Sequence, residues 1–351
     1  MDYDILKLHL YDLNEDEKFY KNYYYARQQT FSHQKFLAEL DRNEVINRRL
    51  IIPDLPETVP EILVDSWSPD SAQESGVAVM KHNRYTPVFS HKHTFFEIGY
   101  LYGGSCTQKI SGWEIKLQAG DFFVIPPGTY HSVSGMNDDL ILFNAMLPGN
   151  TLQSIYHHFL NTKNPLSFFF LNHLLTEDSS DYIIYHSGAD PYIREGFLRM
   201  YWEYESKQRY YYQCIANTLS TIMYALIRSY EKTVEIPYNY SRSSAQQYEI
   251  LQYMRKHLVE TSLPDVAEHF HYSPEHTSRL IKDATGLTFS RMLTRMRMEQ
   301  AVQYLLHTNM TVSAIGYSLG YKTPEHFIRK FRQTLNMTPT EYRKANTSDV
   351  S

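Results

Sequence analysis

A short pattern that occurs twice near the C-terminus, fifty residues apart, constrains the fold of this chain more than any other feature. Ser273–His276 reads Ser-Pro-Glu-His, and Thr323–His326 repeats it as Thr-Pro-Glu-His. In both copies a hydroxyl residue that can cap a helix precedes a proline and an acid, which favour the first helical turn. The pattern therefore predicts that a helix begins at each copy.

A short amphipathic segment that contains one small residue precedes each copy. The first segment, Leu263–Phe270, contains Ala267, and the second, Val312–Leu319, contains Gly316. A short helix, a tight turn and a second helix form a helix-turn-helix unit, in which a small residue lets the two helices approach. The sequence thus predicts two such units, joined by a longer helix over about Phe289–Leu306.

The second helix of each unit carries polar and basic side chains outside its apolar packing face. Arg can contact guanine edges, and the major groove of DNA, about 12 Å wide, admits one α-helix. Arg343 and Lys344 are additional candidates for contacts with phosphates. The predicted DNA-binding surface consists of Glu275, Ser278, Arg279 and Lys282 in the first unit and of Lys322, Glu325, His326, Arg329 and Arg332 in the second.

The charge of the chain is divided unevenly between its two parts. The whole chain has a formal net charge of −5, but residues 241–351 contain 14 Lys and Arg against 10 Asp and Glu. A basic excess at one end is typical of a module that meets phosphates. The alternative that the pattern leaves open is a helical protein-interaction module whose charges are solvated.

Three motifs within residues 242–345 resemble the signature of the AraC/XylS family of bacterial regulators. They are Ile315–Tyr321, Phe327-x-Arg329-x-Phe331-Arg332, and Thr338-Pro339-x-x-Tyr342-Arg343. The resemblance implies seven helices, with two recognition helices that enter successive major grooves of double-stranded DNA. RNA polymerase is a further partner compatible with this role. The base-reading positions that the resemblance implies are Glu275, Ser278, Arg279, Glu325, His326 and Arg329.

A second group of candidate residues lies in a strand-rich region. Residues 77–147 contain short apolar or alternating runs separated by Gly and Pro, which indicate a β-sandwich or barrel. His91, His93 and Glu97 have odd numbers within one predicted strand, so the period of two places them on one face. His131 follows after a turn. Three imidazoles and a carboxylate that face one interior could hold a divalent transition metal.

The spacing of these four residues resembles the two motifs of cupin barrels, the first ending at Gly104 and the second running from Gly120 to His131. Two positions depart from the motifs, because Tyr85 and Gly135 stand where Gly and Asn are expected. Regulators of the AraC family often carry cupin-like sensor domains, which the resemblance places here at 61–150. Three interpretations stay open: a metal site, a pocket for a small effector such as a sugar that requires no cofactor, and structural histidines.

The remaining regions are predicted to be helical. Residues 1–60 form a mostly helical extension that ends in a proline-rich linker at 53–60. Residues 151–236 form a helical connector with helices at 191–206 and 208–231. Four histidines without metal-site spacing are interpreted as surface or packing residues: His82, His157, His158 and His186. A stripe that predicts a homodimer interface, or alternatively packing on the sensor, consists of Ile215, Leu219, Ile222 and Leu226.

Several features exclude other classes of protein. Cys106 and Cys214 have no neighbouring cysteine, which fits a reduced compartment without disulfides. There is no signal peptide, and the apolar run Leu166–Leu171 is far shorter than the roughly 18 residues of a membrane span. No nucleophile–base pair or phosphate-binding loop is present.

We therefore expect a cytoplasmic, multidomain α+β protein that is a regulator and not an enzyme. It would have an N-terminal cupin-like β-barrel, a helical connector that also dimerises, and a C-terminal all-α module with two helix-turn-helix units. The rival class is a cupin metalloenzyme with an appended helical domain. This rival is less favoured because the chain departs from the cupin metal motif at Tyr85 and Gly135.

Overall fold

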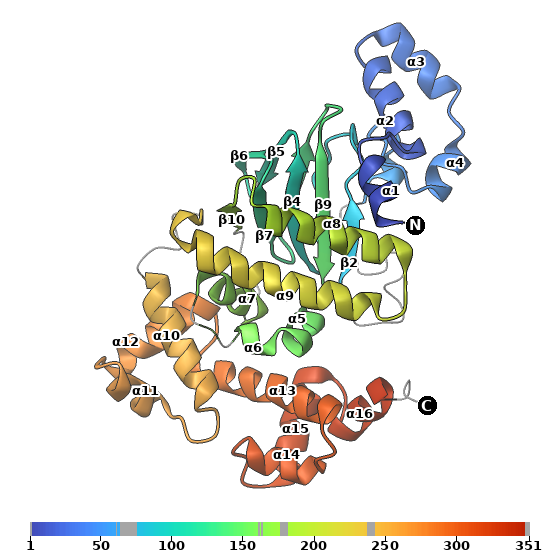
Figure 1. The fold of residues 1–351 in the computed structure, drawn as a ribbon. Coiled ribbons are helices and arrows are strands. Elements are labelled where there is room, and N and C mark those ends of the chain that lie inside the picture. The colour runs from blue at the N-terminus through green and yellow to red at the C-terminus, as the bar shows by residue number, and fades with distance from the viewer. Residues whose placement is uncertain are drawn as a thin grey trace. The chain divides into compact units, whose positions relative to one another are not determined.

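The computed structural model describes residues 2–60, 62–63, 76–160, 162, 164–175, 182–236 and 243–347 (Figure 1). The chain divides into two compact units. The N-terminal unit comprises Met1–Phe170 and Ser179–Pro237, and the C-terminal unit comprises Leu171–Asp178 and Tyr238–Ser351. Within the described ranges, no helix is both long enough and apolar enough to cross a membrane.

The N-terminal unit begins with four short helices, as the sequence predicts for this region. They are α1 (Tyr3–Leu8), α2 (Glu15–Ala26), α3 (Thr30–Ala38) and α4 (Arg42–Asn47), followed by the 3₁₀ turn η1 (Pro56–Thr58). Asn14 caps α2 in a capping box with Glu17, in which each side chain bonds to the other's backbone N–H. Helices α1, α2 and α4 therefore start after polar residues that satisfy otherwise unpaired backbone donors, whereas α3 has no such cap.

The predicted linker at 53–60 is packed at its start. Leu50, Ile52 and Leu55 are buried in one cluster with Tyr23 of α2 and with Tyr85. The linker interpretation is wrong at Leu55, whose side chain belongs to this core, and it stays a prediction for the other residues of 53–60. The helical extension is thereby packed against the residues that precede the β-strands.

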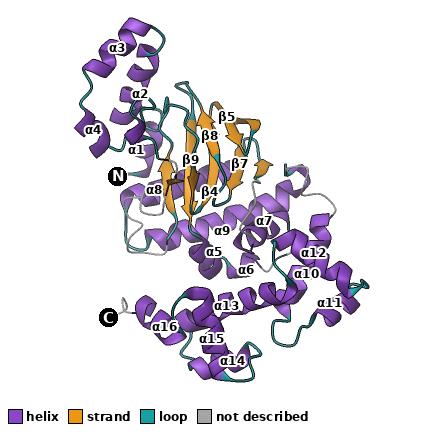
Figure 2. Ribbon diagram, turned by 180° about the vertical axis from the view of Figure 1, so that it is seen from behind, coloured by secondary structure: helices purple, strands orange, loops and turns teal. Residues whose placement is uncertain are grey.

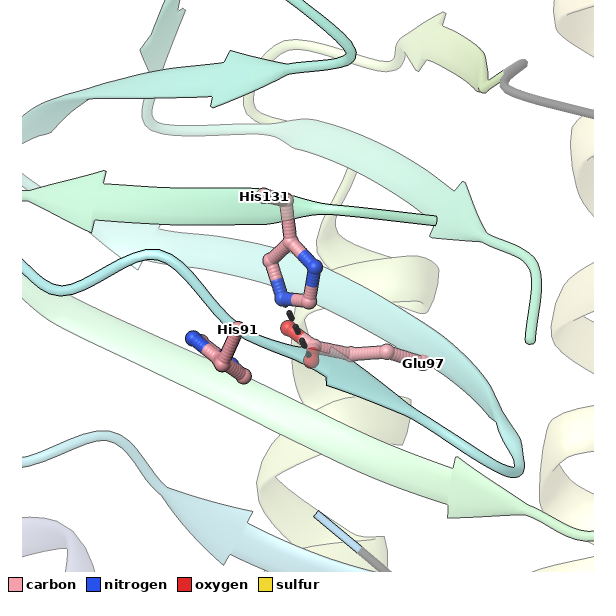
Figure 3. Close-up of side chains that lie close together, drawn as sticks. All are labelled: His91, Glu97 and His131. Atoms are coloured by element: carbon pink, nitrogen blue, oxygen red, sulfur yellow. Dashed lines mark ion pairs between the residues drawn. The ribbon is translucent and has the colours of Figure 1, made fainter. Parts of the chain in front are cut away.

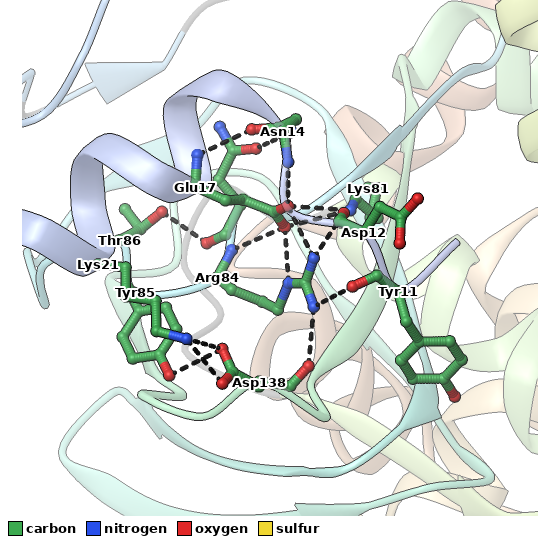
Figure 4. A network of polar contacts seen from close by, with 11 residues as sticks. Tyr11, Asp12, Asn14, Glu17, Lys21, Lys81, Arg84, Tyr85, Thr86 and Asp138 are labelled. Carbon is green, nitrogen blue, oxygen red and sulfur yellow. Dashed lines mark hydrogen bonds and ion pairs between the residues drawn. The ribbon is translucent and has the colours of Figure 1, made fainter. Parts of the chain in front are cut away.

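A buried ion pair also connects the first helices to the strand region (Figure 4). Glu17 and Arg84 are 0% and 1% exposed, and the Arg84 Nη2 donates to a carboxylate oxygen of Glu17 at 2.9 Å. The same guanidinium donates to the carbonyls of Tyr11, Asp12 and Asp138 at 2.8–3.0 Å. Because its donors are partnered, this charge is held inside the protein without an uncompensated desolvation penalty.

Two antiparallel sheets form the centre of the N-terminal unit (Figure 2). In the first sheet the order is β10-β7-β4-β9-β2, and in the second it is β6-β5-β8. Apolar side chains from both sheets form one buried cluster that includes Leu101, Ile110, Phe123 and Val133. The strands are β2 (Ala78–Lys81), β4 (Phe96–Gly103), β5 (Ser105–Ile110), β6 (Trp113–Gln118), β7 (Asp121–Ile125), β8 (His131–Ser134), β9 (Ile141–Leu147) and β10 (Ile183–His186). A short parallel pair, β1 (Ile62–Leu63) and β3 (Lys92–His93), lies apart from these two sheets.

Helices follow strands β9 and β10 in the chain, and α8 packs against β2 and β4 of the larger sheet. The helices are α5 (Gly149–Ile155), α6 (His157–Leu160), α7 (Pro165–Leu175), α8 (Pro191–Ser206) and α9 (Tyr211–Tyr230), followed by η3 (Glu231–Thr233). Helix α8 begins at Pro191, as its Asp190 cap predicts. Its Phe197 stacks on Tyr100 of β4 at a centroid distance of 4.6 Å.

The apolar stripe of α9 is used inside the N-terminal unit. Ile215, Leu219, Ile222 and Leu226 are all 0% exposed. At Gly196 of α8, a Cβ atom would lie 2.8 Å from Ile222, so the two helices approach closely. The predicted dimer interface on this stripe is therefore wrong, since the stripe belongs to the unit's own core.

The C-terminal unit contains seven helices over residues 243–347. They are α10 (Ser243–Lys256), α11 (Leu263–His269), α12 (Pro274–Thr285), α13 (Phe289–His307), α14 (Val312–Ser318), α15 (Pro324–Leu335) and α16 (Pro339–Thr347). Their apolar side chains form two separate cores, one centred on α10–α12 and the other on α14–α16, and α13 contributes to both. The two predicted helix-turn-helix units and the joining helix are confirmed.

Candidate functional sites

The two second helices of the helix-turn-helix units, α12 and α15, begin as the repeated pattern predicts. The Ser273 hydroxyl accepts a hydrogen bond from the His276 N–H at 3.1 Å. The Thr323 hydroxyl accepts one from the His326 N–H at 3.3 Å. Each helix ends at a residue in the left-handed conformation, Gly286 and Asn336 respectively. Both helices are thus limited by local sequence at both ends.

The predicted DNA-binding residues lie outside the two apolar cores. Ile281 of α12 and Phe327 and Phe331 of α15 are 0% exposed and anchor the inner faces. With the exception of the half-buried Ser278, every predicted side chain is exposed. The exposed set comprises Glu275, Arg279, Lys282, Lys322, Glu325, His326, Arg329 and Arg332.

The two matching arginines differ in their surroundings. Arg279 donates from Nη2 to the Nδ1 of His276 at 2.9 Å, so the two side chains share one face of α12. Arg329 has no ion pair with any described residue. It lines an open groove on α15 together with Glu325, Ile328 and Arg332.

Arg343 does not lie free for phosphate contacts. Its Nε donates to the Leu305 carbonyl at 3.0 Å, and its Nη2 donates to the Thr308 carbonyl at 3.3 Å. The guanidinium therefore caps the C-terminal end of α13 and holds α16 against it. The prediction of a phosphate contact for Arg343 is corrected accordingly, because its donors point inward.

In the N-terminal unit, His91, Glu97 and His131 converge in the interior of the β-region (Figure 3). One potential ligand atom from each lies within 4.8 Å of the others. The Glu97 carboxylate lies 3.4 Å from the His131 Nε2 and 3.2 Å from the His93 Nε2. The structure thus brings together the four residues that the sequence predicted to share one interior. The prediction of a single strand is wrong, since β3 ends at His93 and β4 begins at Phe96.

The carboxylate controls the electrostatics of this cluster. Burial opposes charge on Glu97, but His131 and His93 outweigh it, so the pKa of Glu97 lies well below its ordinary value. Burial likewise opposes protonation of His131, yet the hydrogen bond and charge of Glu97 raise its pKa. Burial and the neighbouring His131 lower the pKa of His91 to about 3. A negative carboxylate thus lies beside imidazoles of different basicity.

A hydrogen bond to the backbone orients the ring of His131. The His131 Nδ1 donates to the Thr129 carbonyl at 3.1 Å, which turns the Nε2 toward Glu97. The His93 Nδ1 is buried without a hydrogen-bond partner, whereas the Nε2 atoms of His93 and His131 face the Glu97 carboxylate. A ring held by a backbone carbonyl, with its other nitrogen available, is the arrangement that metal-binding histidines have.

Three further polar residues, which the sequence interpretation did not single out as site residues, also belong to this interior. Gln108 of β5 is 0% exposed, and neither end of its amide has a hydrogen-bond partner. The Asn144 Oδ1 on β9 is also buried and unpartnered. Burial lowers the pKa of His82, against the charge of Glu97, which fits the packing alternative predicted for this residue.

Strand register explains how Gln108 reaches the same interior as His131. Gln108 pairs with Val133, and Ile110 pairs with His131, so all four side chains lie on one face of the smaller sheet. In the sequence, Gln108 alternates with Cys106 and Ile110 at a period of two, and this alternation would have indicated that its side chain points inward. It was missed because a single Gln in an apolar alternation is usually not distinguished from a tolerated core residue.

Two family models match the chain, one in each unit. A model described as a helix-turn-helix domain matches residues 266–345. A model described as an AraC-like ligand binding domain matches residues 72–151. One part of the chain is therefore similar to an AraC-like ligand binding domain, and another part is similar to a helix-turn-helix domain.

Known proteins are similar to this chain over different lengths. The regulatory protein PocR of Salmonella typhimurium is 36% identical over 95 residues, which are 27% of this chain and 31% of PocR. The uncharacterized HTH-type transcriptional regulator YobQ of Bacillus subtilis is 25% identical over 292 residues, which are 80% of this chain and 98% of YobQ. The C-terminal domain of the response regulator AraT from Geobacillus stearothermophilus is 33% identical, with a TM-score of 0.30, and covers 32% of this chain and 94% of that domain. This chain thus spans about a third of PocR but nearly all of YobQ.

Proposed function

We propose that this protein binds double-stranded DNA at specific sequences and regulates transcription, and that a small effector in the β domain controls its activity. The observation that carries the DNA half is the pair of matching recognition helices, each with an exposed arginine three residues after its histidine. The family matches support the same function. They favour regulation over catalysis, since both models describe parts of regulators.

The two helices offer two kinds of contact with DNA. Arg279 and Arg329 can each donate two hydrogen bonds to the O6 and N7 of a guanine in the major groove. Glu275 and Glu325 can accept from a cytosine amino group. Ser278 and His326 lie beside these positions and are proposed as further base contacts. Lys282, Lys322 and Arg332 are assigned to phosphates, which position the protein without reading sequence.

A binding-site selection with the full chain tests this function. Random duplexes that the wild type retains should share a motif, and its affinity should fall as salt rises, with a log–log slope of roughly −0.9 per phosphate contacted. Arg279→Ala and Arg329→Ala should each cost about 1–3 kcal/mol at the selected site and relax preference at one base position. Lys322→Ala is the matched control, since it should weaken specific and random DNA alike. Absence of any selected motif would refute the proposal.

The effector is proposed to be a small neutral molecule rich in hydroxyl groups, such as a carbohydrate. Gln108 offers one unpartnered donor and one unpartnered acceptor, and Asn144 offers an unpartnered acceptor. A hydroxyl group both donates and accepts, so it can satisfy either end of such an amide. A series of sugars and polyols in a thermal-shift assay tests this, with Gln108→Leu as the variant that should lose the stabilisation.

A divalent transition metal is the second candidate for the same interior. The donor set fits, since His91, Glu97 and His131 offer imidazole nitrogens and a carboxylate at mutual distances suited to one ion. His93 would remain outside this set, stacked on Phe95 at a centroid distance of 4.5 Å. A bound metal would act as a Lewis acid that fixes an oxygen of the effector. Elemental analysis should then find about one equivalent of metal in the wild type and none in His91→Ala.

We further propose that the protein works in the cytoplasm as a homodimer that can contact RNA polymerase. The DNA partner supports the location, and two-fold dimers are the commonest assemblies of soluble proteins. The interface would lie away from Ile215, Leu219, Ile222 and Leu226, because these side chains are buried. Light scattering with and without the selected DNA tests the dimer. A monomer in both conditions would rule it out.

A further inference from the structure

In helix α13, a single residue separates the apolar cores of the two helix-turn-helix units. Met296 packs in the core of the first helix-turn-helix unit, and Met298 packs in the core of the second. Arg297 lies between them in sequence and is half-buried. Figure 1 shows α13 as one continuous helix that runs from the first helix-turn-helix unit into the second. The axial distance between the two units is therefore set by this helix, at about 1.5 Å per residue.

The side chain of Arg297 contacts backbone or side chains from both units. Its Nε donates to the Leu258 carbonyl at 2.8 Å, and its Nη2 donates to the Val259 carbonyl at 3.2 Å. These carbonyls follow α10, in the first unit. The same guanidinium lies over the ring of Tyr321, 5.6 Å from its centroid. Tyr321 belongs to the turn between α14 and α15, in the second unit.

A glycine allows the two turns to approach each other. Gly320 has a φ of +80°, which favours glycine, and a Cβ atom there would lie 2.7 Å from the Val259 carbonyl oxygen. The same atom would lie 3.3 Å from the Arg297 Nη2. The turn of the second unit is thus packed directly against the turn that follows α10, with Arg297 between them.

We propose that Arg297, with Tyr321 and Gly320, is a positioning residue that sets the angle between recognition helices α12 and α15. This inference rests on the proposed function. A continuous helix can bend or twist, so α13 alone does not hold the two units at one angle. Two hydrogen bonds to one unit and a cation–π contact to the other resist this motion. Arg297 therefore determines which separation between two DNA half-sites the protein accepts.

The geometry of DNA makes this separation sensitive to the angle. Duplex DNA turns once in about 10–10.5 base pairs, so each inserted base pair rotates the second half-site by roughly 35°. A rigid pair of helices should therefore discriminate against a change of one base pair. Two recognition helices that are connected only through α13 should tolerate a change of one base pair between the half-sites.

The experiment uses the full chain and the motif obtained by selection. Duplexes with the two half-sites at the selected separation, and with one base pair removed or added, are compared for affinity. The wild type should prefer the selected separation by about tenfold or more, a difference typical of one unfavourable position in a site. Arg297→Lys keeps the charge but loses the planar fork, and Tyr321→Leu keeps the bulk but loses the ring. Arg291→Lys, an exposed position on the same helix, is the control.

The expected result is that both junction variants bind all three separations within about threefold of one another, while affinity for a single half-site stays unchanged. Retained spacing preference in both folded variants would overturn the proposal. An even loss of affinity with a shallower salt slope would overturn it too, since Arg297 would then contact phosphate. If neither variant folds by thermal melting, Arg297 is a stability residue and the positioning role falls. A wild type without a selected motif would instead refute the proposed function.

Discussion

Two buried polar clusters in the N-terminal unit differ in how completely their hydrogen-bonding groups are partnered. In the cluster around Glu17 and Arg84, all three guanidinium nitrogens donate to carboxylate or carbonyl oxygens. In the cluster around Glu97, the amide of Gln108 and the Nδ1 of His93 have no hydrogen-bond partner. Both clusters are nearly inaccessible to solvent, so burial does not explain the difference.

The difference indicates which cluster stabilises the fold and which one serves function. A buried polar group without a partner destabilises a protein by about 1–3 kcal/mol, so several of them in one place need a reason. A ligand or metal that completes their hydrogen bonding or coordination provides that reason. The partnered cluster needs no ligand. Its role is to hold the N-terminal helices against the strands.

The largest expected effect is on stability in the partnered cluster. Glu17→Ala leaves Arg84 buried without its carboxylate, and we expect a loss of about 3–5 kcal/mol in the free energy of unfolding. Urea denaturation measures it. Glu15→Ala, which removes an exposed acid from the same helix, should leave the midpoint unchanged. A loss below about 1 kcal/mol, as in an exposed pair, would contradict the structural role of this cluster.

The same carboxylate should make stability depend on acid pH. Burial opposes its charge, but Arg84, the Asn14 N–H and Lys81 lower the pKa of Glu17 below its ordinary value of 4.5. Its contribution is therefore present above pH 4.5 and is lost as the pH falls through the folded-state pKa. Melting temperatures of the wild type and Glu17→Gln should converge as the pH falls from 7 toward 3. A constant difference would contradict the assignment.

The unpartnered cluster should respond in the opposite direction. Gln108→Leu removes an unsatisfied amide of similar volume, so we expect the free energy of unfolding to rise by about 1 kcal/mol or stay unchanged. Effector-dependent transcription should be lost in the same variant. Thermal melting and a reporter assay measure the two effects. If Gln108→Leu destabilises the protein but leaves effector-dependent transcription normal, the proposed difference between the two clusters is wrong.

The smallest effect is expected at His186, which lies on the edge strand β10 of the larger sheet and contacts Asp121 and Glu235. Burial opposes protonation of His186, but hydrogen bonds and charges of Asp121 and Glu235 raise its pKa above 6.5. Its contribution is present below pH 6.5 and is lost as the pH rises through the folded-state pKa. Because the side chain is 41% exposed, solvent screening limits the effect to a few tenths of a kcal/mol. The wild type should melt slightly higher than His186→Gln at pH 6, and this difference should shrink at pH 8.

Much of the C-terminal unit could be predicted from sequence, because its signals are local. A cap, a proline and an acid act within one helical turn, and they set the starts of α12 and α15 without help from distant residues. The same holds for α8, which begins after Asp190-Pro191. The convergence of His91, Glu97 and His131 was also predictable, from parity and from the cupin-like spacing of the motifs.

What only the tertiary structure decided is where each face and each donor is used. Periodicity shows that α9 has an apolar stripe, but it does not show that α8 covers it, because that contact depends on Gly196. Sequence shows basic residues, but only the fold shows that Arg297 and Arg343 donate to carbonyls of other segments. Propensities act over a few residues, whereas burial and hydrogen-bond partners depend on segments far apart in the chain. For that reason the sequence determined the elements of this protein, and the tertiary structure decided their partners.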